Sequence, residues 1–185
     1  MKRLFIIFIF CLNSSFESTA QKNSDISFDS LLAIKGKKSI GTKFPAFRTR
    51  NKFTIIDNGS LNGKVTYINF WFKDCPPCIA EMKSLNEMYE KLKHVKDFQF
   101  FSFTFESEKT IEGMRKKYKM NYPIFHLTKN KCYQLNQDSG FPVHLIVDKQ
   151  GIIQFLLSGY HTEEKGAHNY LFSKVYPEIV SVLNK

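Results

Sequence analysis

The stretch VTYINFWFKDCPPCIAEM, residues 65–82, holds two cysteines separated by two prolines, between an apolar run and a candidate helix. Its first eight residues are mostly β-branched or aromatic and are apolar on nearly every side, which is typical of a central strand covered on both faces. From Ile79 onward, apolar residues recur at spacings of three and four, which predicts an amphipathic helix with a solvated Glu/Lys face. The two thiols therefore lie where a buried strand gives way to a helix.

The C-x-x-C spacing places Cys75 at the end of the strand and Cys78 in the first turn of the helix. A helix N-terminus carries unpaired N–H groups and roughly half a positive charge, which stabilise a thiolate there. We therefore interpret Cys75 as the nucleophile that attacks a disulfide, and the more covered Cys78 as the resolving thiol. Pro76 and Pro77 fit the first turn and remove amide donors that would stabilise the thiolate, which favours a reductant.

Asp74, directly before the first cysteine, has two interpretations. Its carboxylate would repel a thiolate on Cys75 and make the reduced form less stable as an anion. Alternatively, Asp74 caps the helix. Both hypotheses remain open at the level of the sequence.

Two other uses of the thiol pair fit the sequence less well. Zinc needs four ligands and one C-x-x-C supplies two, while Cys132 and the five histidines offer no second paired spacing. We therefore expect no stable metal and no cofactor. A purely structural disulfide across so short a loop would restrain the unfolded chain little. Reversible dithiol–disulfide exchange is the remaining hypothesis.

The rest of the chain predicts an α/β fold with a mixed central sheet flanked by helices and an N-terminal strand extension. Alternating strands and helices follow the cysteine pair, and a hairpin and a last helix complete the order. The expected segments are short strands broken by turns in 43–64, a strand at 97–105, a helix capped by Ser107, a short strand in 121–127, a hairpin in 140–160 with its turn at 148–151, and a helix from Thr162 that Pro177 breaks or kinks.

The N-terminus predicts export. A basic start at Lys2 and Arg3, an apolar run at 4–12 and small residues up to Ala20 are typical of a secretory signal peptide over residues 1–20. An uncleaved membrane anchor, or a lipid on Cys11, is an alternative. We expect a mobile leader at 21–40, one domain at 41–185, and a periplasmic location in which disulfides persist.

The chain is basic, with 27 Lys and Arg against 17 Asp and Glu. The lysines are spread along the sequence without a dense basic block or a nucleic-acid-binding motif, so we expect a solvated basic surface and no nucleic-acid partner. Attraction to acidic partner proteins or anionic membranes is compatible with this charge.

Two stretches, GSLNGKVTYINFWFKDCPPCIAEMKSLNEMY at 59–89 and GFPVHLIVDKQGII at 140–153, resemble the thioredoxin superfamily, and most closely its exported TlpA/ResA-like branch. The resemblance covers roughly residues 41–160. It implies a thiol-disulfide oxidoreductase that reduces or exchanges disulfides of other exported proteins, often in cytochrome c maturation. It also implies re-reduction by a membrane electron donor.

The resemblance assigns further site residues. Pro142 would be a cis-proline against the disulfide, and the backbone of Phe141 would pair with an extended segment of a partner. Glu106 is the nearest match to a buried acid that relays a proton to Cys78, with Glu108 as competitor; a simple helix-start carboxylate is the alternative.

The sequence also departs from its relatives. Asp74 replaces a frequent Trp. Phe141 is bulkier than the usual Thr or Ile, and it either grips partners or narrows the cleft.

Related folds and functions offer competing assignments. Peroxiredoxins need Thr or Ser three residues before the reactive cysteine, and Phe72 stands there instead, which argues against peroxide reduction. Cys132 is expected to be a half-buried small hydrophobe. The alternative function is a non-catalytic binder that uses the same thiols, either a metal chaperone or a redox-regulated adaptor.

Overall fold

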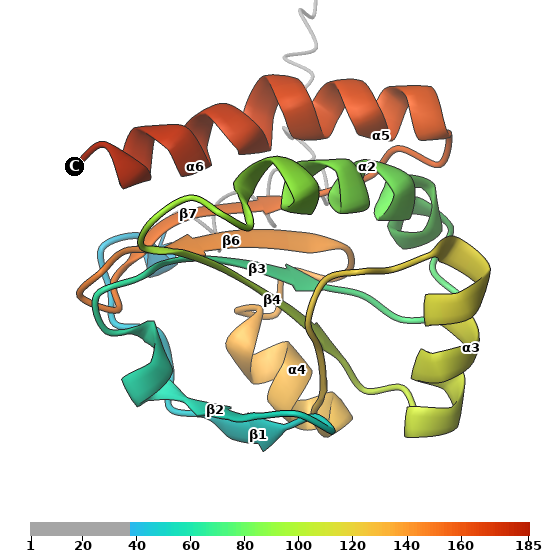
Figure 1. Ribbon diagram of the computed structural model, residues 1–185, viewed down its shortest axis with the longest axis horizontal. Coiled ribbons are helices and arrows are strands. Elements are labelled where there is room, and N and C mark those ends of the chain that lie inside the picture. The colour runs from blue at the N-terminus through green and yellow to red at the C-terminus, as the bar shows by residue number, and fades with distance from the viewer. Residues whose placement is uncertain (1–37) are drawn as a thin grey trace, which may run out of the picture.

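A five-stranded mixed sheet forms the centre of the computed structural model, which describes residues 38–185 (Figure 1). The strand order is β5-β4-β3-β6-β7. Strands β3, β4 and β5 are parallel to one another, whereas β6 is antiparallel to both β3 and β7. The expected mixed sheet is confirmed. The predicted signal peptide and most of the predicted leader lie outside the described residues.

The elements follow the predicted order closely. The strands are β1 Arg48–Arg50, β2 Ile55–Asp57, β3 Val65–Phe70, β4 Phe98–Thr104, β5 Ile124–His126, β6 Val143–Val147 and β7 Ile153–Ser158. The helices are η1 Asn58–Leu61, α2 Pro76–Leu92, α3 Glu108–Tyr118, α4 Lys129–Leu135, α5 Glu164–Tyr170, η2 Leu171–Val175 and α6 Tyr176–Leu183.

Each central strand sends alternate side chains into one of two apolar cores, as a pleated strand covered on both faces must. On β3, Tyr67 faces the core made with α2, α3 and the C-terminal helices, whereas Ile68 faces the core made with α4 and the N-terminal segment. Figure 1 shows α2 and α5–α6 on one side of the sheet and α4 on the other. The α2 side also contains both cysteines of the pair.

The N-terminal extension is a separate two-stranded antiparallel sheet, β1-β2. The predicted turn at 57–59 is instead the start of the 3-10 helix η1, which Asp57 caps by accepting from the Gly59 amide at 2.9 Å. Phe44 and Phe47 of this region are buried against the α4 side of the sheet. The extension therefore closes the second core.

The C-terminal helix differs from the prediction at its start and in its middle. It begins after Glu163 rather than at Thr162, and Leu171–Val175 forms a π-helical segment directly before the turn that contains Pro177. Because proline lacks an amide hydrogen and occupies the first turn of α6, the regular hydrogen-bond ladder shifts just ahead of it. The predicted kink is therefore a change of helical register.

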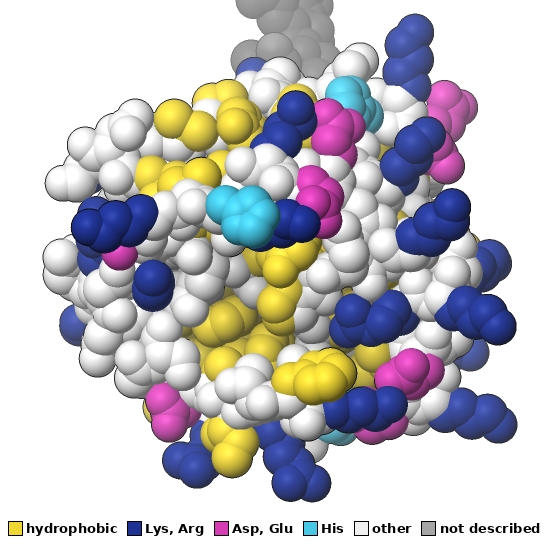
Figure 2. All heavy atoms as spheres, in the orientation of Figure 1, with side chains coloured by type: hydrophobic (Ala, Val, Ile, Leu, Met, Phe, Trp, Pro, Cys, Tyr) yellow, Lys and Arg dark blue, Asp and Glu magenta, His cyan; other side chains and the backbone are white. Residues whose placement is uncertain are grey.

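Figure 2 shows basic side chains distributed over one face of the molecule, with acidic side chains among them.

Within residues 38–185, every helix falls short of the length and apolar character that a bilayer crossing requires.

Candidate active site

Cys75 and Cys78 form a disulfide at the N-terminus of α2, with 5.2 Å between their Cα atoms. Cys75 is the N-cap of α2, and its Sγ accepts a hydrogen bond from the Cys78 amide at 3.3 Å. Both residues are nearly covered, Cys75 being 3% exposed and Cys78 1%. Because both residues are buried, exposure does not distinguish them, and the roles of nucleophile and resolving thiol stay predictions.

The helix start explains why a sulfur atom lies there. Pro76 and Pro77 fill the first two helical positions, where a missing amide hydrogen breaks no bond. The first amide available to a capping group is then that of Cys78, and it points at the Cys75 sulfur. The same amide would stabilise a Cys75 thiolate after reduction.

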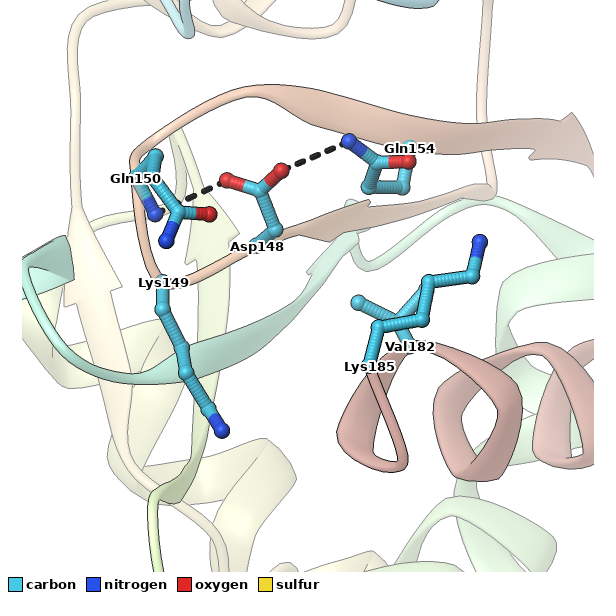
Figure 3. Close-up of a pocket in the computed structure, with 6 residues that line it drawn as sticks. All are labelled: Asp148, Lys149, Gln150, Gln154, Val182 and Lys185. Carbon is cyan, nitrogen blue, oxygen red and sulfur yellow. Dashed lines mark hydrogen bonds between the residues drawn. The ribbon is translucent and has the colours of Figure 1, made fainter.

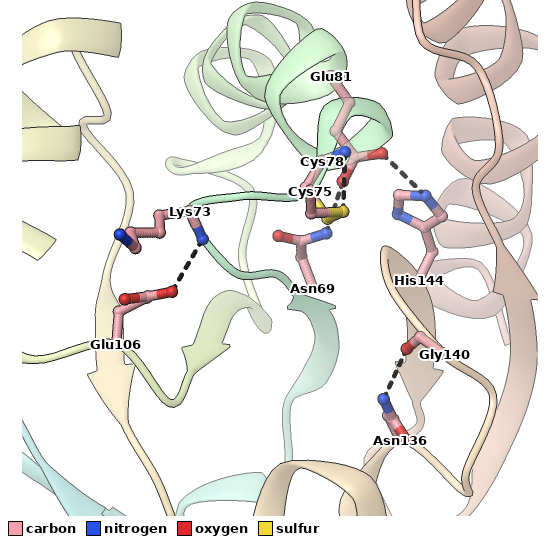
Figure 4. The surroundings of a disulfide bond; sticks show 9 residues. All are labelled: Asn69, Lys73, Cys75, Cys78, Glu81, Glu106, Asn136, Gly140 and His144. Carbon is pink, nitrogen blue, oxygen red and sulfur yellow. Dashed lines mark hydrogen bonds and ion pairs between the residues drawn. A yellow bond between two sulfur atoms is a disulfide. The ribbon is translucent and has the colours of Figure 1, made fainter. Parts of the chain in front are cut away.

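A cis peptide bond joins Phe141 to Pro142, directly before β6. The loop that carries it is fixed on both sides: Asn136 Nδ2 donates to the Gly140 carbonyl at 2.7 Å, and the Gly159 amide donates to the Pro142 carbonyl at 3.0 Å. Figure 4 shows the Asn136–Gly140 bond below the disulfide. The geometry fits a cis-proline loop beside the disulfide, and its pairing with a partner backbone stays a prediction.

Phe141 belongs to a half-buried aromatic cluster. Its ring meets those of Phe72, Phe105 and Tyr133 edge-on, with centroid distances of 5.4, 5.7 and 5.4 Å. Lys129 Nζ lies 5.7 Å from the centroid of the Phe105 ring. Aromatic side chains of the protein itself therefore hold the Phe141 ring, which can still narrow the cleft or contact a partner.

Asp74 does not cap α2, so that interpretation is wrong. The N-cap is Cys75, because the chain reaches helical geometry only after it. The Asp74 side chain is 75% exposed, and its Oδ2 lies 3.4 Å from Lys73 Nζ. Water and this neighbour screen its charge, so any repulsion of a Cys75 thiolate is reduced.

Glu106 holds the backbone ahead of the cysteines. Its Oε1 accepts from the Lys73 amide at 3.0 Å, and Figure 4 shows its side chain on the Lys73 side of the site, away from Cys78. Glu108 lies in the first turn of α3 and is exposed. The structure thus gives Glu106 a positioning contact with the active-site loop and does not bring it to Cys78.

The carboxylate in the buried layer next to Cys78 belongs to Glu81, although helical periodicity predicts a solvated Glu/Lys face for this helix. Glu81 is 2% exposed, and its Oε1 accepts from Asn69 Nδ2 at 2.9 Å. Residues three apart share one face of a helix, so Glu81 lies one turn beyond Cys78 on the same face. Figure 4 shows the Glu81 carboxylate between the disulfide and His144.

His144 of β6 completes this layer from the neighbouring strand. Its side chain is fully buried; Nε2 lies 3.2 Å from Glu81 Oε2, and Nδ1 lies 2.7 Å from the Tyr67 hydroxyl. Burial, together with the charge of Glu81, raises the pKa of Tyr67 well above its ordinary value, so the phenol stays protonated. Sequence reasoning missed these residues, although a single polar side chain inside an apolar strand such as VHLIV was a usable signal.

This arrangement can carry out thiol chemistry. A buried carboxylate beside the resolving thiol can accept its proton, and the helix N-terminus can stabilise the nucleophilic thiolate. Asn69 Oδ1 has no hydrogen-bond partner within the described part of the chain. The buried layer next to the sulfurs therefore contains a hydrogen-bond acceptor that is not used in the oxidised state.

Cys132 is fully buried in α4, on the other face of the sheet from the disulfide, rather than half-buried as expected. Burial raises the pKa of its thiol to about 12.

Among residues 38–185, no group of three or more His, Cys, Asp or Glu side chains is arranged to hold a metal ion.

A surface cavity lies at the far end of β6 from the cis-proline, between the β6–β7 turn and the end of α6 (Figure 3). Its lining residues are Asp148, Lys149, Gln150, Gln154, Val182 and Lys185. Asp148 is engaged within the turn, where its Oδ1 accepts from the Gln150 and Ile152 amides. This cavity therefore contributes nothing to the thiol site.

Residues 40–156 match the family described as AhpC/TSA, a range that spans the sheet, the disulfide and the cis-proline and covers more than half of the 185 residues. The chain belongs to the AhpC/TSA family. The family match ends before the C-terminal helices, of which α5 and η2 pack on α2.

Two relatives with the same name illustrate the similarity in sequence. The chain is 27% identical over 140 residues to the thiol-disulfide oxidoreductase ResA of Bacillus cereus, covering 75% of this chain and 80% of the relative. It is 26% identical over 141 residues to ResA of Bacillus subtilis, covering 74% and 77%. The resemblance to the ResA-like branch is confirmed, and the chain is a thiol-disulfide oxidoreductase.

A solved structure supports the fold. The thiol:disulfide interchange protein of the thioredoxin family from Chlorobium tepidum TLS superposes with a TM-score of 0.61 at 19% identity, covering 77% of this chain and 97% of that one. The thioredoxin-like fold predicted from the sequence is therefore confirmed.

Proposed function

We propose that this AhpC/TSA-family protein reduces disulfides of other exported proteins through Cys75 and Cys78, in a pathway such as cytochrome c maturation. The observation that carries the proposal is the Cys75–Cys78 disulfide at the start of α2, near a cis-proline loop. In this disulfide, Cys75 Sγ accepts a hydrogen bond from the Cys78 amide. The name of the ResA relatives supports the chemistry. Export rests on the signal-like N-terminus of the sequence.

The reaction begins when a Cys75 thiolate attacks a partner disulfide, and one partner sulfur leaves as a thiolate. Cys78 then loses its proton and attacks Cys75 Sγ, which releases the second partner sulfur. Two electrons pass from the protein dithiol to the partner, which ends as two thiols. A membrane electron donor would return the protein to the dithiol state.

The proposal is tested by trapping. A Cys78→Ser variant lacks the resolving thiol, so partners should accumulate as mixed disulfides on Cys75 in an extract of the native cell envelope, and mass spectrometry identifies them. The matched Cys75→Ser variant should trap far less, because it lacks the sulfur that the Cys78 amide stabilises as a thiolate. An absence of adducts in the Cys78→Ser extract, with insulin reduction by the unmodified protein intact, contradicts the proposed partner class.

The alternative, a metal chaperone or adaptor that uses the same thiols, makes a different prediction. It requires stoichiometric copper or zinc on the protein after anaerobic purification, together with no reduction of insulin. Elemental analysis of that preparation decides between the two functions.

A further inference from the structure

His144 is an unusual residue for its place in the fold. It is the second residue of β6, a strand whose five residues are all buried, and it faces the layer that contains Cys78 and Glu81. A buried imidazole costs free energy unless its nitrogens have partners. Here both nitrogens face a polar atom: Nδ1 faces the Tyr67 hydroxyl at 2.7 Å and Nε2 faces Glu81 Oε2 at 3.2 Å.

The protonation pattern follows from the partners. Tyr67 stays protonated, so its hydroxyl can donate to Nδ1, and the proton of the neutral ring then lies on Nε2. That nitrogen faces the Glu81 carboxylate, although the 3.2 Å contact is not aligned as a hydrogen bond in the oxidised state. Asn69 fixes the other carboxylate oxygen at 2.9 Å. Each oxygen of the Glu81 carboxylate therefore has a nitrogen atom of a neighbouring strand close to it.

We propose that His144, oriented by Tyr67, is a positioning residue that holds the Glu81 carboxylate ready to accept the proton of Cys78 in the resolving step. The proposal rests on the thiol-disulfide exchange described above. In that step the S–H proton passes to Glu81, and the S–H electron pair forms the bond to Cys75 Sγ. The bond between Cys75 and the partner breaks, and the partner sulfur leaves with its electron pair as a thiolate.

The groups that face the pair come from every element packed around it. They are Cys78 and Glu81 from α2, Tyr67 and Asn69 from β3, Tyr170 from α5, and Tyr122 before β5. Burial raises the pKa of Tyr67, Tyr122 and Tyr170, so these phenols remain neutral through the range in which thiols react. The proton that moves in the resolving step is therefore exchanged between the thiols and the Glu81–His144 pair, not with these phenols.

The test separates the two chemical steps. Reduced protein is mixed rapidly with excess 4,4′-dithiodipyridine, and release of the thione is followed by absorbance. The first equivalent of thione reports the attack of Cys75 on the reagent, and its rate of release depends on reagent concentration. The second equivalent reports formation of the Cys75–Cys78 disulfide, and its rate of release does not depend on reagent concentration. The variants are His144→Gln, Tyr67→Phe and, as a matched control, Tyr89→Phe, whose half-buried ring packs against the same core but does not face the Glu81–His144 pair.

For His144→Gln we expect the second phase to slow by about tenfold, a fraction of what a general base contributes, and the first to change by less than about threefold. The pH profile of the second phase should also change, whereas that of the first should not, because the lost N–H no longer faces the carboxylate that accepts the Cys78 proton. Tyr67→Phe should change the second phase in the same direction by a smaller factor. Tyr89→Phe should match the unmodified protein.

Equal slowing of both phases, or an unchanged second phase and pH profile in both His144→Gln and Tyr67→Phe, overturns the role of His144. If His144→Gln does not fold, as judged by circular dichroism, Tyr67→Phe decides alone, because it removes a single oxygen. If the unmodified protein fails to release the second equivalent at all, the exchange mechanism itself is wrong, which is a distinguishable result.

Discussion

Gly159 shows how tightly single residues are matched around the thiol site. A Cβ atom there would lie 2.8 Å from Pro142 Cγ, 3.2 Å from His144 Nε2 and 3.4 Å from Glu81 Oε2. The first of these distances is too short for a real contact, so the cis-proline loop or β7 would have to move. The absence of a side chain at Gly159 therefore allows Pro142, His144 and Glu81 to pack close to its backbone.

We predict that Gly159→Ala lowers the free energy of unfolding by about 1–3 kcal/mol, the usual cost of forcing an extra methyl group into a packed region. Urea denaturation followed by circular dichroism measures the effect. The control is Gly113→Ala on the exposed side of α3, where a Cβ meets nothing within 4 Å. That change should instead stabilise by about 0.5–1 kcal/mol, because alanine favours a helix over glycine. Equal effects at the two sites would contradict this account.

Cys132 should be chemically silent in the folded protein. Its pKa is raised to about 12 by burial, so at pH 8 almost none of it is thiolate, the reactive form. In a Cys75→Ser/Cys78→Ser variant, iodoacetamide at about pH 8 should leave Cys132 unmodified when the protein is folded and modify it in urea. Peptide mapping by mass spectrometry provides the measurement. Equally fast labelling in the two conditions would show that the thiol is accessible.

At the scale of elements, the start of α3 is set by a helix-capping residue that can be recognised in the sequence. Ser107 is its N-cap, and its Oγ accepts from the Thr110 amide at 3.2 Å. The helix places Glu108 in the first turn and basic residues in the last, which suits its dipole. The predicted cap is confirmed because capping depends on residues within one turn and not on distant packing.

Ser107→Ala should therefore lower the free energy of unfolding by about 1 kcal/mol. Ser107→Asp should retain most of the stability, since its carboxylate can accept the same hydrogen bond and lies at the positive end of the helix. Urea midpoints of the three proteins give the comparison. The account fails if the Asp variant loses as much stability as the Ala variant.

The sequence predicted the elements whose signals are local or periodic. The strand at 65–72, the helix after the cysteine pair and the hairpin with its turn at 148–151 all appear, with ends shifted by three residues at most. Helix α4 was not predicted, because its seven residues are too few to show a period. Its apolar residues Cys132 and Leu135 are buried against the second core, so tertiary packing supports this helix.

The site divides in the same way. Cys75, Cys78 and Pro142 were found because motif spacing and resemblance identify them. Glu81 was missed because helical periodicity assigns a glutamate beside lysines to solvent, whereas β6 covers it with a histidine from more than sixty positions away. Pairings between distant strands and helices are visible only once the fold is built.

At the scale of the whole molecule, the net charge of +10 should influence which partners react fastest. A basic surface raises the local concentration of acidic partners and lowers that of basic ones, and salt removes the effect. Near the thiol site, Lys73 is half-exposed and Lys129 lies beside the aromatic cluster, while Asp74 offsets part of their charge. The field that a partner meets is therefore set by the molecule as a whole and only partly by the site.

We predict that the reduced protein reduces an acidic disulfide-linked peptide faster than a basic peptide of the same length at low salt. Raising the salt from about 0.01 M to about 1 M shortens the screening length from about 30 Å to about 3 Å, so the two rates should converge. Second-order rate constants, measured by the fluorescence of the single tryptophan, Trp71, which lies in the same core as both cysteines, provide the readout. The control is dithiothreitol-driven reduction of the same peptides, which carries no such charge preference. If the basic peptide reacts as fast as the acidic one at low salt, the basic surface plays no part in partner choice.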